Sequence, residues 1–115
     1  MHADSHPYAY VLLRQDLPPE QQIVQASHAA YEAGFRFEQP AQTTSIILLS
    51  VPDRAALEAA AQRLARHGIE HHMFFEPDFE MGHSALATRP LLSRKERHLM
   101  RKYPLFKAAG ARHAE

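Results

Sequence analysis

A row of polar side chains on one expected helix carries the most recognisable chemistry in this sequence. Amide, imidazole and carboxyl groups recur at spacings i, i+4, i+7 and i+11, at Gln21, Gln25, His28 and Glu32. Residues with these spacings share one stripe of an α-helix. Because an imidazole titrates near neutral pH and can transfer a proton, His28 is a candidate catalytic base. The alternative is that the stripe is simply hydrated and that His28 is a structural histidine bound by a neighbouring polar group.

Other chemistries are poorly represented. The chain has no cysteine, which excludes disulfides, thiolate nucleophiles and thiolate metal sites. Its four glycines are dispersed, so no phosphate-binding glycine loop is present. The nine histidines include no H-x-x-x-H pair on an expected helix, and we therefore expect neither a metal nor a cofactor. Ser27 and His28 are adjacent, so on a helix they diverge by about 100° and do not form a nucleophile–base pair.

The polar stripe belongs to a strand–helix unit near the start of the chain. Residues Tyr8–Arg14 form an apolar run rich in aromatic and β-branched types, which predicts a buried strand. The pair Pro18-Pro19 suits the first turn of a helix, and Gly34 predicts the end of that helix. One side of the helix is predicted to face the core, and it comprises Ile23, Ser27, Ala30, Tyr31 and Gly34, with Val24 at its margin.

The remaining elements complete a single α/β domain. Strands are predicted over Ser45–Val51, 69–75 and 84–88, and helices between Asp53 and Gly68 and from Arg94 to before Pro104. The last helix opens with the capping-box pattern Ser93-x-x-Glu96. Helical connections favour parallel pairing, whereas the short connection between the last two strands favours antiparallel pairing. We therefore expect one domain over residues 1–115, with helices on both faces of a four-stranded mixed sheet and with mobile ends at 1–7 and 107–115.

The net charge is zero, but the charges are distributed unevenly. Residues 1–88 contain 5 basic and 11 acidic side chains, whereas residues 89–115 contain 8 basic and 2 acidic ones. The expected last helix carries the densest group of cations, at Arg94, Lys95, Arg97, Arg101 and Lys102. Such a group is typical of contacts with nucleic-acid phosphates. A solvated helix that offsets an acidic body would give the same pattern.

The sequence indicates no interaction with a membrane. No apolar stretch approaches the roughly 18 residues that a membrane-spanning helix needs. The first residues lack the basic and apolar regions of a signal peptide. We therefore expect a cytoplasmic protein.

Three sequence features together resemble the type II peptidyl-tRNA hydrolases. They are an R-x-D-L motif directly after the first strand, a Q-x-S-H-A-A motif from Gln25 to Ala30, and an S-A-L-A-T strand followed by Arg89-Pro90. The order of the elements agrees with that family, and the resemblance extends over residues 8–92. It implies a three-layer α/β/α domain of the peptidyl-tRNA hydrolase II type.

The resemblance also implies an active site drawn from three places in the chain. Glu76 corresponds to an aspartate at the end of the family's third strand, and Ser84 to a threonine at the start of the fourth. The family carries a glycine- and lysine-rich stretch before the helix, where this chain has Pro18-Pro19-Glu20-Gln21 and no lysine. Positive charge would then come from Arg14 or from the C-terminal cations.

The reaction implied by the resemblance is hydrolysis of the ester between a peptide, or an N-blocked amino acid, and tRNA. Glu76 or His28 would activate a water molecule, and Ser84 and Gln25 would orient it or stabilise the oxyanion. The phosphates of tRNA or another RNA would be bound by Arg14, Arg94, Lys95, Arg97, Arg101 and Lys102. The alternative is a non-catalytic RNA-binding or protein-interaction module on the same fold. A homodimer formed through Phe74 or Phe79 also remains open.

Overall fold

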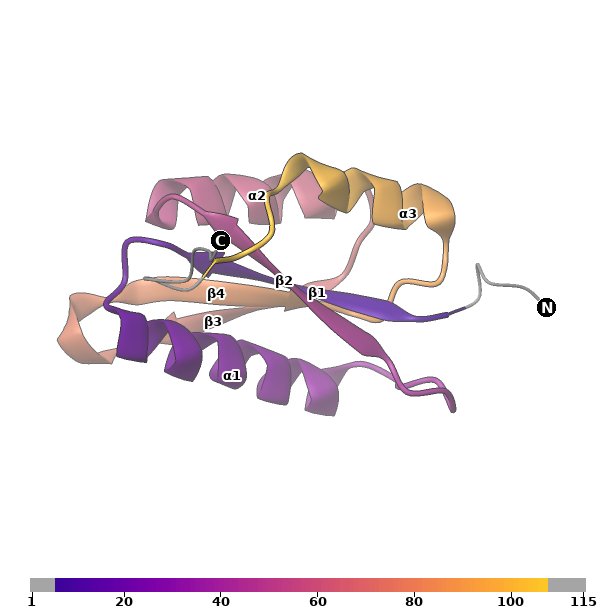
Figure 1. The fold of residues 1–115 in the computed structure, drawn as a ribbon, viewed down its shortest axis with the longest axis horizontal. Coiled ribbons are helices and arrows are strands. Elements are labelled where there is room, and N and C mark those ends of the chain that lie inside the picture. The colour runs from indigo at the N-terminus through magenta and orange to yellow at the C-terminus, as the bar shows by residue number, and fades with distance from the viewer. Residues whose placement is uncertain (1–5, 108–115) are drawn as a thin grey trace, which may run out of the picture.

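A computed structural model of the chain describes residues 6–107. Four strands form one sheet in the order β2-β1-β4-β3 (Figure 1). Their bounds are Tyr8–Arg14 for β1, Ser45–Val51 for β2, His71–Glu76 for β3 and Gly82–Thr88 for β4. Strand β1 is parallel to β2, and β4 is antiparallel to both β1 and β3. The predicted mixed four-stranded sheet is thus confirmed, with β1 and β2 at the predicted bounds.

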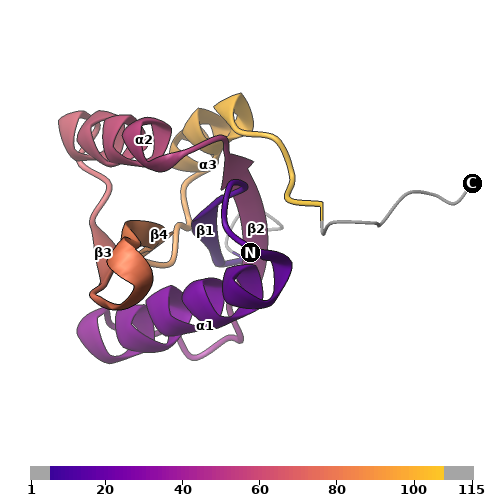
Figure 2. The ribbon, with the colours of Figure 1, turned by 90° about the vertical axis from the view of Figure 1, so that its left-hand side faces the viewer.

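Helices cover both faces of this sheet (Figures 1 and 2). Helix α1 (Pro19–Arg36) lies on one face, and α2 (Arg54–Arg66) and α3 (Arg94–Leu99) lie on the other. The predicted helix start at Ser93 is confirmed, because the Ser93 hydroxyl accepts from the Glu96 N–H at 3.2 Å. Asp53 caps α2 in the same way, and its carboxylate accepts from the Ala56 N–H at 2.9 Å. Two short 3₁₀ helices, η2 (Asp78–Glu80) and η3 (Met100–Lys102), follow β3 and α3.

The two faces of the sheet have cores of different character. The core under α2 and α3 contains large side chains, among them Leu12, Leu57, Leu64, Leu86 and Met100. The core under α1 is built mainly from small ones, and alanines at 29, 33, 85 and 87 pack there around Val11 and Leu13. Because side chains alternate along a strand, Leu86 and its neighbours Ala85 and Ala87 serve opposite faces. Small residues allow the backbone of α1 to lie close to the sheet.

The buried face of α1 is not the predicted one. Ile23 and Tyr31 are 73% and 69% exposed, and Ser27 and Gly34 are exposed as well. The buried residues are instead Gln22, Gln25, Ala29 and Ala33. The prediction from helical spacing gave the wrong side because it treated glutamine as a surface residue. The buried amides of Gln22 and Gln25 are both hydrogen-bonded, which makes their burial possible.

The end of α1 also differs from the prediction. Gly34 lies within the helix, which continues to Arg36, and the Phe37 N–H donates to Ala33 O at 3.0 Å. Phe37 packs against the small-residue core, so tertiary contact extends the helix past the glycine. In the described part of the chain, no helix is long and apolar enough to cross a membrane.

A short segment after η3 covers part of the outer edge of β2. The Ser50 N–H donates to Pro104 O at 2.9 Å, and the Phe106 N–H donates to Leu48 O at 2.9 Å. At the other end of β2, the Ser45 N–H donates to the carbonyl of Pro7, which is buried. Of the ends expected to be mobile, residues 1–5 and 108–115 lie outside the described residues.

Candidate functional site

A network of polar side chains joins the first half of α1 to the end of β3 and the start of β4. The Ser84 hydroxyl donates to Oε1 of Gln25 at 2.5 Å, and Nε2 of Gln25 donates to Oε1 of Glu76 at 2.8 Å. The same Nε2 donates to Oε1 of Gln21 at 3.2 Å. Gln25 therefore contacts both Glu76 and Ser84, the two residues that the resemblance implies in one site with it.

A β-bulge explains why Ser84 reaches this network. In the pairing of β3 with β4, Phe74 lies opposite Ala85 while Phe75 lies opposite His83, so Ser84 has no opposite residue. Such an extra residue turns the following part of the strand, and two successive side chains can then share a face. Ser84 and Ala85 both face α1, whereas His83 faces α2 and its Nδ1 lies 2.8 Å from Oε2 of Glu58.

Glu76 is held as a carboxylate. The hydrogen bond from Gln25 lowers the pKa of the Glu76 carboxyl, and this effect outweighs the opposing effect of desolvation. The Asp78 N–H, which donates to Oε2 at 3.2 Å, and the charge of His28 lower the pKa further. Glu76 is therefore ionised at neutral pH, and both of its oxygens have a fixed donor.

The polar stripe of α1 packs along the edge strand β3. Beyond the Gln25–Glu76 contact, the His28 ring stacks on Phe74 with centroids 4.5 Å apart, and Glu32 Oε1 lies 2.7 Å from Nε2 of His72. Successive partners on β3 are two residues apart, because alternate side chains of a strand point to the same face. The stripe is thus a helix–strand interface, although His28 itself remains exposed.

Burial changes the roles that can be assigned to two of the predicted residues. Gln25 and Ser84 are both 0% exposed. Neither side chain can touch a substrate or a water molecule at the surface in this structure, so the expected direct contact with an attacking water or an oxyanion is not supported. Both act through Glu76, which is partly exposed and has its orientation fixed by them.

Arg14 is part of the framework beside the network. Its guanidinium donates to the carbonyls of Met81 at 2.8 Å and His83 at 3.0 Å, and it forms two hydrogen bonds with Asp16. The side chain is only 12% exposed. These contacts leave Arg14 positioned to hold the turn between β3 and β4 rather than to meet a phosphate.

A cavity of about 450 Å³ adjoins the network. Gln21 lies in its wall, together with Arg14, Leu17, Pro18, Glu20, Phe79, Glu80 and Met81. Two of these residues are carboxylates, and the cation among them is already paired with Asp16. The cavity is therefore acidic, in contrast to a lysine-rich phosphate site.

The basic residues of the C-terminal region lie on the other side of the sheet. Helix α3, with Arg94, Lys95 and Arg97, packs on the face opposite α1 (Figure 2), and Arg101 and Lys102 follow in η3. Arg97 donates to Leu92 O at 2.8 Å and lies over the Tyr8 ring at 5.2 Å. The structure does not bring these cations to Glu76, so they do not line one site with it.

Several residues near the site were not predicted from the sequence. Gln22 donates to the carbonyls of Gln15 and Leu17 at 3.1 and 3.0 Å and thereby fixes the β1–α1 loop. Phe79 and Glu80 adopt positive φ angles of 59° and 53°, which neither residue type suggests. Among the described residues, no three histidine or acidic side chains are grouped to hold a metal ion.

Comparison of the sequence with known protein families gives no match, and a comparison with curated proteins gives none.

Proposed function

We propose that the protein is an esterase of the peptidyl-tRNA hydrolase II type, which cleaves the ester between a peptide or N-blocked amino acid and tRNA. The observation that carries this proposal is the chain of hydrogen bonds from Ser84 through Gln25 to Glu76. Two buried side chains on different elements orient one accessible carboxylate. An arrangement of this kind is typical of a catalytic base held by positioning residues.

Glu76 would act on a water molecule placed between its carboxylate and the ester carbonyl. The water oxygen attacks the carbonyl carbon while its proton passes to Glu76, giving a tetrahedral oxyanion. The bond from carbon to the ribose oxygen then breaks, and Glu76 returns the proton to that oxygen. The products are a free carboxylic acid and tRNA. His28 of α1, which is exposed and close enough to Glu76 for its charge to affect that carboxyl, is the second candidate for the base.

Gln21 is a better candidate for the oxyanion donor than Gln25 or Ser84. Its Oε1 accepts from Gln25, so its NH₂ group is directed away from that partner, and Gln21 also lines the adjoining cavity. An amide N–H can stabilise a developing oxyanion. In this proposal Gln25 and Ser84 hold Glu76 and Gln21 in place.

The basic group on α3 and η3 would bind tRNA away from the reacting ester. Because α3 and α1 cover opposite faces, only a ligand as large as tRNA could contact both. Affinity from such a group depends on phosphate neutralisation and falls steeply with salt. The acidic cavity would receive the uncharged ester and the peptide, not the phosphates.

Release of tRNA from N-acetyl-aminoacyl-tRNA tests the proposal. Wild-type protein should show multiple turnover, and Glu76→Gln should lower kcat/KM by about tenfold or more, which corresponds to about 1.4 kcal/mol of barrier. Glu38→Gln, which removes an exposed carboxylate from the loop after α1, is the matched control and should retain full activity. Absence of turnover by folded wild-type protein would reject the esterase.

A second candidate function is a protein-interaction module. It is favoured by the apolar outer side of α1, where Ile23, Tyr31 and Phe35 are 73%, 69% and 75% exposed. Tyr31 and Phe35 are in edge-to-face contact at 4.9 Å. Apolar side chains grouped on a surface are typical of interaction sites. The sequence left open a homodimer formed through Phe74 or Phe79. Phe79 is exposed, whereas Phe74 is partly buried and stacked against His28.

A further inference from the structure

The sheet ends on one side in a strand whose outer side is uncovered. The strand order β2-β1-β4-β3 places β3 at this edge, and the last residue of β3 is Glu76 (Figure 2). Among the described residues, neither a strand nor an isolated bridge pairs with β3 on the side away from β4. The opposite edge is different, because the segment after η3 pairs there with β2. The edge strand without such a covering therefore ends at the proposed catalytic base.

The pairing of β3 with β4 determines which backbone groups of β3 are available on the outer side. The Arg89 N–H donates to Glu70 O at 3.0 Å, one residue before the β3–β4 pairing begins. Because hydrogen-bonded and non-hydrogen-bonded pairs alternate between antiparallel strands, the even-numbered residues of β3 are bonded to β4. The bulge does not interrupt this alternation, since its extra residue belongs to β4. The residues whose N–H and C=O groups point away from β4 are His71, Met73 and Phe75.

The sequence of β3 does not discourage the addition of another strand. Edge strands commonly prevent such pairing with lysine or proline, and β3 contains neither. Its only carboxylate is at its end, at Glu76. Main-chain hydrogen bonds to an edge of this kind bind extended peptides in many protein complexes. The outer side of β3 is thus suited to an extended chain.

The position of Glu76 decides the direction in which the peptide of the proposed substrate would run. The ester joins the last residue of the peptide to tRNA, so the carboxyl end of the peptide must lie at Glu76. Because β3 also ends at Glu76, a peptide that follows β3 runs parallel to it. Phe79 and Met81, which follow β3 in the chain, line the acidic cavity. The residue that carries the ester would enter that cavity, and the preceding residues would lie along β3.

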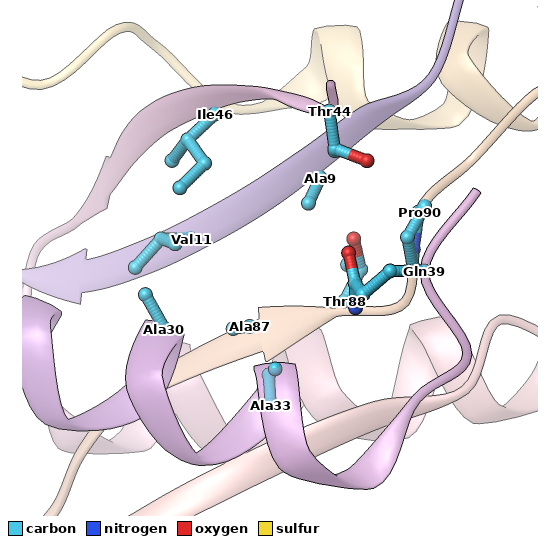
Figure 3. A pocket seen from close by; sticks show the side chains of 11 residues that line it. Ala9, Val11, Ala30, Ala33, Gln39, Thr44, Ile46, Ala87, Thr88 and Pro90 are labelled. Atoms are coloured by element: carbon cyan, nitrogen blue, oxygen red, sulfur yellow. The ribbon is translucent and has the colours of Figure 1, made fainter. Parts of the chain in front are cut away.

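A second cavity on the α1 face offers no alternative path for the peptide. It has a volume of about 250 Å³ and lies between the second half of α1 and strands β1, β2 and β4 (Figure 3). Short side chains form much of its wall, among them Ala9, Ala30, Ala33 and Ala87. No residue of β3 lines this cavity, and neither does Glu76. A peptide held there would not have its ester beside the proposed base.

We propose that the outer side of β3 binds the peptide part of the substrate as an added strand, parallel to β3 and with its carboxyl end toward Glu76. This inference rests on the proposed function. Because main-chain groups supply the hydrogen bonds, peptides of widely different sequence would be accepted. Strand β3 has 6 residues, so about six residues of an extended peptide would lie beside it. The preferred substrates are thus peptidyl-tRNAs, and a single N-blocked amino acid on tRNA is a poorer substrate.

The length of the peptide tests this proposal. Acetylated oligoalanyl-tRNAs with one to eight alanines are hydrolysed by wild-type protein under steady-state conditions. KM should fall by about tenfold or more up to about six alanines and then remain constant, while kcat changes less than about twofold. Replacing one alanine at a time by N-methylalanine removes single N–H groups. KM should rise about threefold or more at every second position and less at the positions between them, because alternate N–H groups of a strand face β3.

His71→Pro tests the protein side of the contact. Proline removes an N–H that points away from β4, at the first residue of the strand, where proline is tolerated. His71→Ala keeps this N–H and is the matched control. His71→Pro should raise KM for the six-alanine substrate about threefold or more and leave KM for acetylalanyl-tRNA unchanged, whereas His71→Ala should behave as wild type with both. The N-methylalanine series in wild-type protein decides the matter even if His71→Pro does not fold.

Binding of a peptide without an ester separates this inference from the esterase. The probe is acetyl-Ala-Thr-Ala-Thr-Ala-Thr methylamide, titrated into wild-type protein while backbone amide signals are followed by NMR. It should shift the signals of His71, Met73 and Phe75 in a saturable manner and slow their hydrogen exchange. These shifts without turnover would reject the esterase and support β3 as a peptide site. Turnover with the same KM at every length, N-methylation effects without alternation, or absence of saturable shifts would overturn the inference.

Discussion

The hydroxyl of Ser84 donates a hydrogen bond to the amide oxygen of Gln25 across 59 residues of sequence. Both side chains are fully buried, and the contact exists because the bulge in β4 turns Ser84 toward α1. Gln25, whose side chain is fixed in this way, donates a hydrogen bond to the carboxylate of Glu76 and fixes its orientation. The position of the one accessible carboxylate in this network is therefore set by an irregularity in the neighbouring strand.

Removing the Ser84 hydroxyl should destabilise the protein. Ser84→Ala leaves the buried Gln25 oxygen without its donor, and an unsatisfied buried acceptor costs about 1–3 kcal/mol of unfolding free energy. Urea denaturation of both proteins measures the difference. Ser27→Ala is the control, because Ser27 is exposed and its hydroxyl only donates to Ile23 O at 2.8 Å. Equal stability of the two variants would show that the Ser84 contact is not required.

The Gln25 amide should control the titration of Glu76. In the folded protein the Glu76 pKa is lowered, chiefly by the hydrogen bond from Gln25. A lowered folded pKa means that Glu76 favours the folded state above its unfolded pKa and that this contribution disappears as the pH falls through the folded value. Gln25→Met, which keeps the volume but removes the donor, should raise the Glu76 pKa and weaken this acid dependence.

Carboxyl carbon chemical shifts of Glu76, followed by NMR between neutral and acidic pH, measure this effect directly. The exposed carboxylate of Glu38, which lies outside the network, provides the internal reference signal in both proteins. A Glu76 pKa that does not move in Gln25→Met would mean that another donor holds the carboxylate.

Two glycines should respond to alanine in opposite directions. Gly82 has φ +70°, and a Cβ there would lie 2.6 Å from Nη1 of Arg54. Gly82→Ala should therefore lower the unfolding free energy by about 1 kcal/mol or more. Gly34 lies inside α1, where a Cβ would meet no neighbouring group within 4 Å, so Gly34→Ala should raise the unfolding free energy by about 0.5–1 kcal/mol. Thermal or urea unfolding measures both free energies. A destabilising Gly34→Ala would contradict the position of Gly34 inside α1, and a stabilising Gly82→Ala would contradict the strained backbone at Gly82.

The sequence was most informative where one residue pattern has one physical solution. Strands β1 and β2 are apolar runs between turn residues, and their predicted bounds match the structure. Asp53 and Ser93 precede helices whose first N–H groups need acceptors, and both supply them. Local chemistry was sufficient at these positions.

The site required information that local patterns do not contain. The helical-wheel prediction placed Gln25 on a polar surface stripe because amides are usually hydrated, yet its hydrogen bonds to Gln21, Glu76 and Ser84 make burial favourable. The bulge at Ser84 depends on the pairing of two strands, and no residue type signals it. The resemblance placed Gln25, Glu76 and Ser84 in one site, but it did not indicate which of them is accessible.

The segment that pairs with β2 gives the sheet a partial fifth strand. A free sheet edge offers unpaired N–H and C=O groups to any extended chain that meets it, and this is a common origin of aggregation. By occupying the Leu48 carbonyl and the Ser50 N–H, residues 104–106 deny those groups to another molecule. The chain thus protects its own edge with three residues, of which Phe106 also packs against the core under α1.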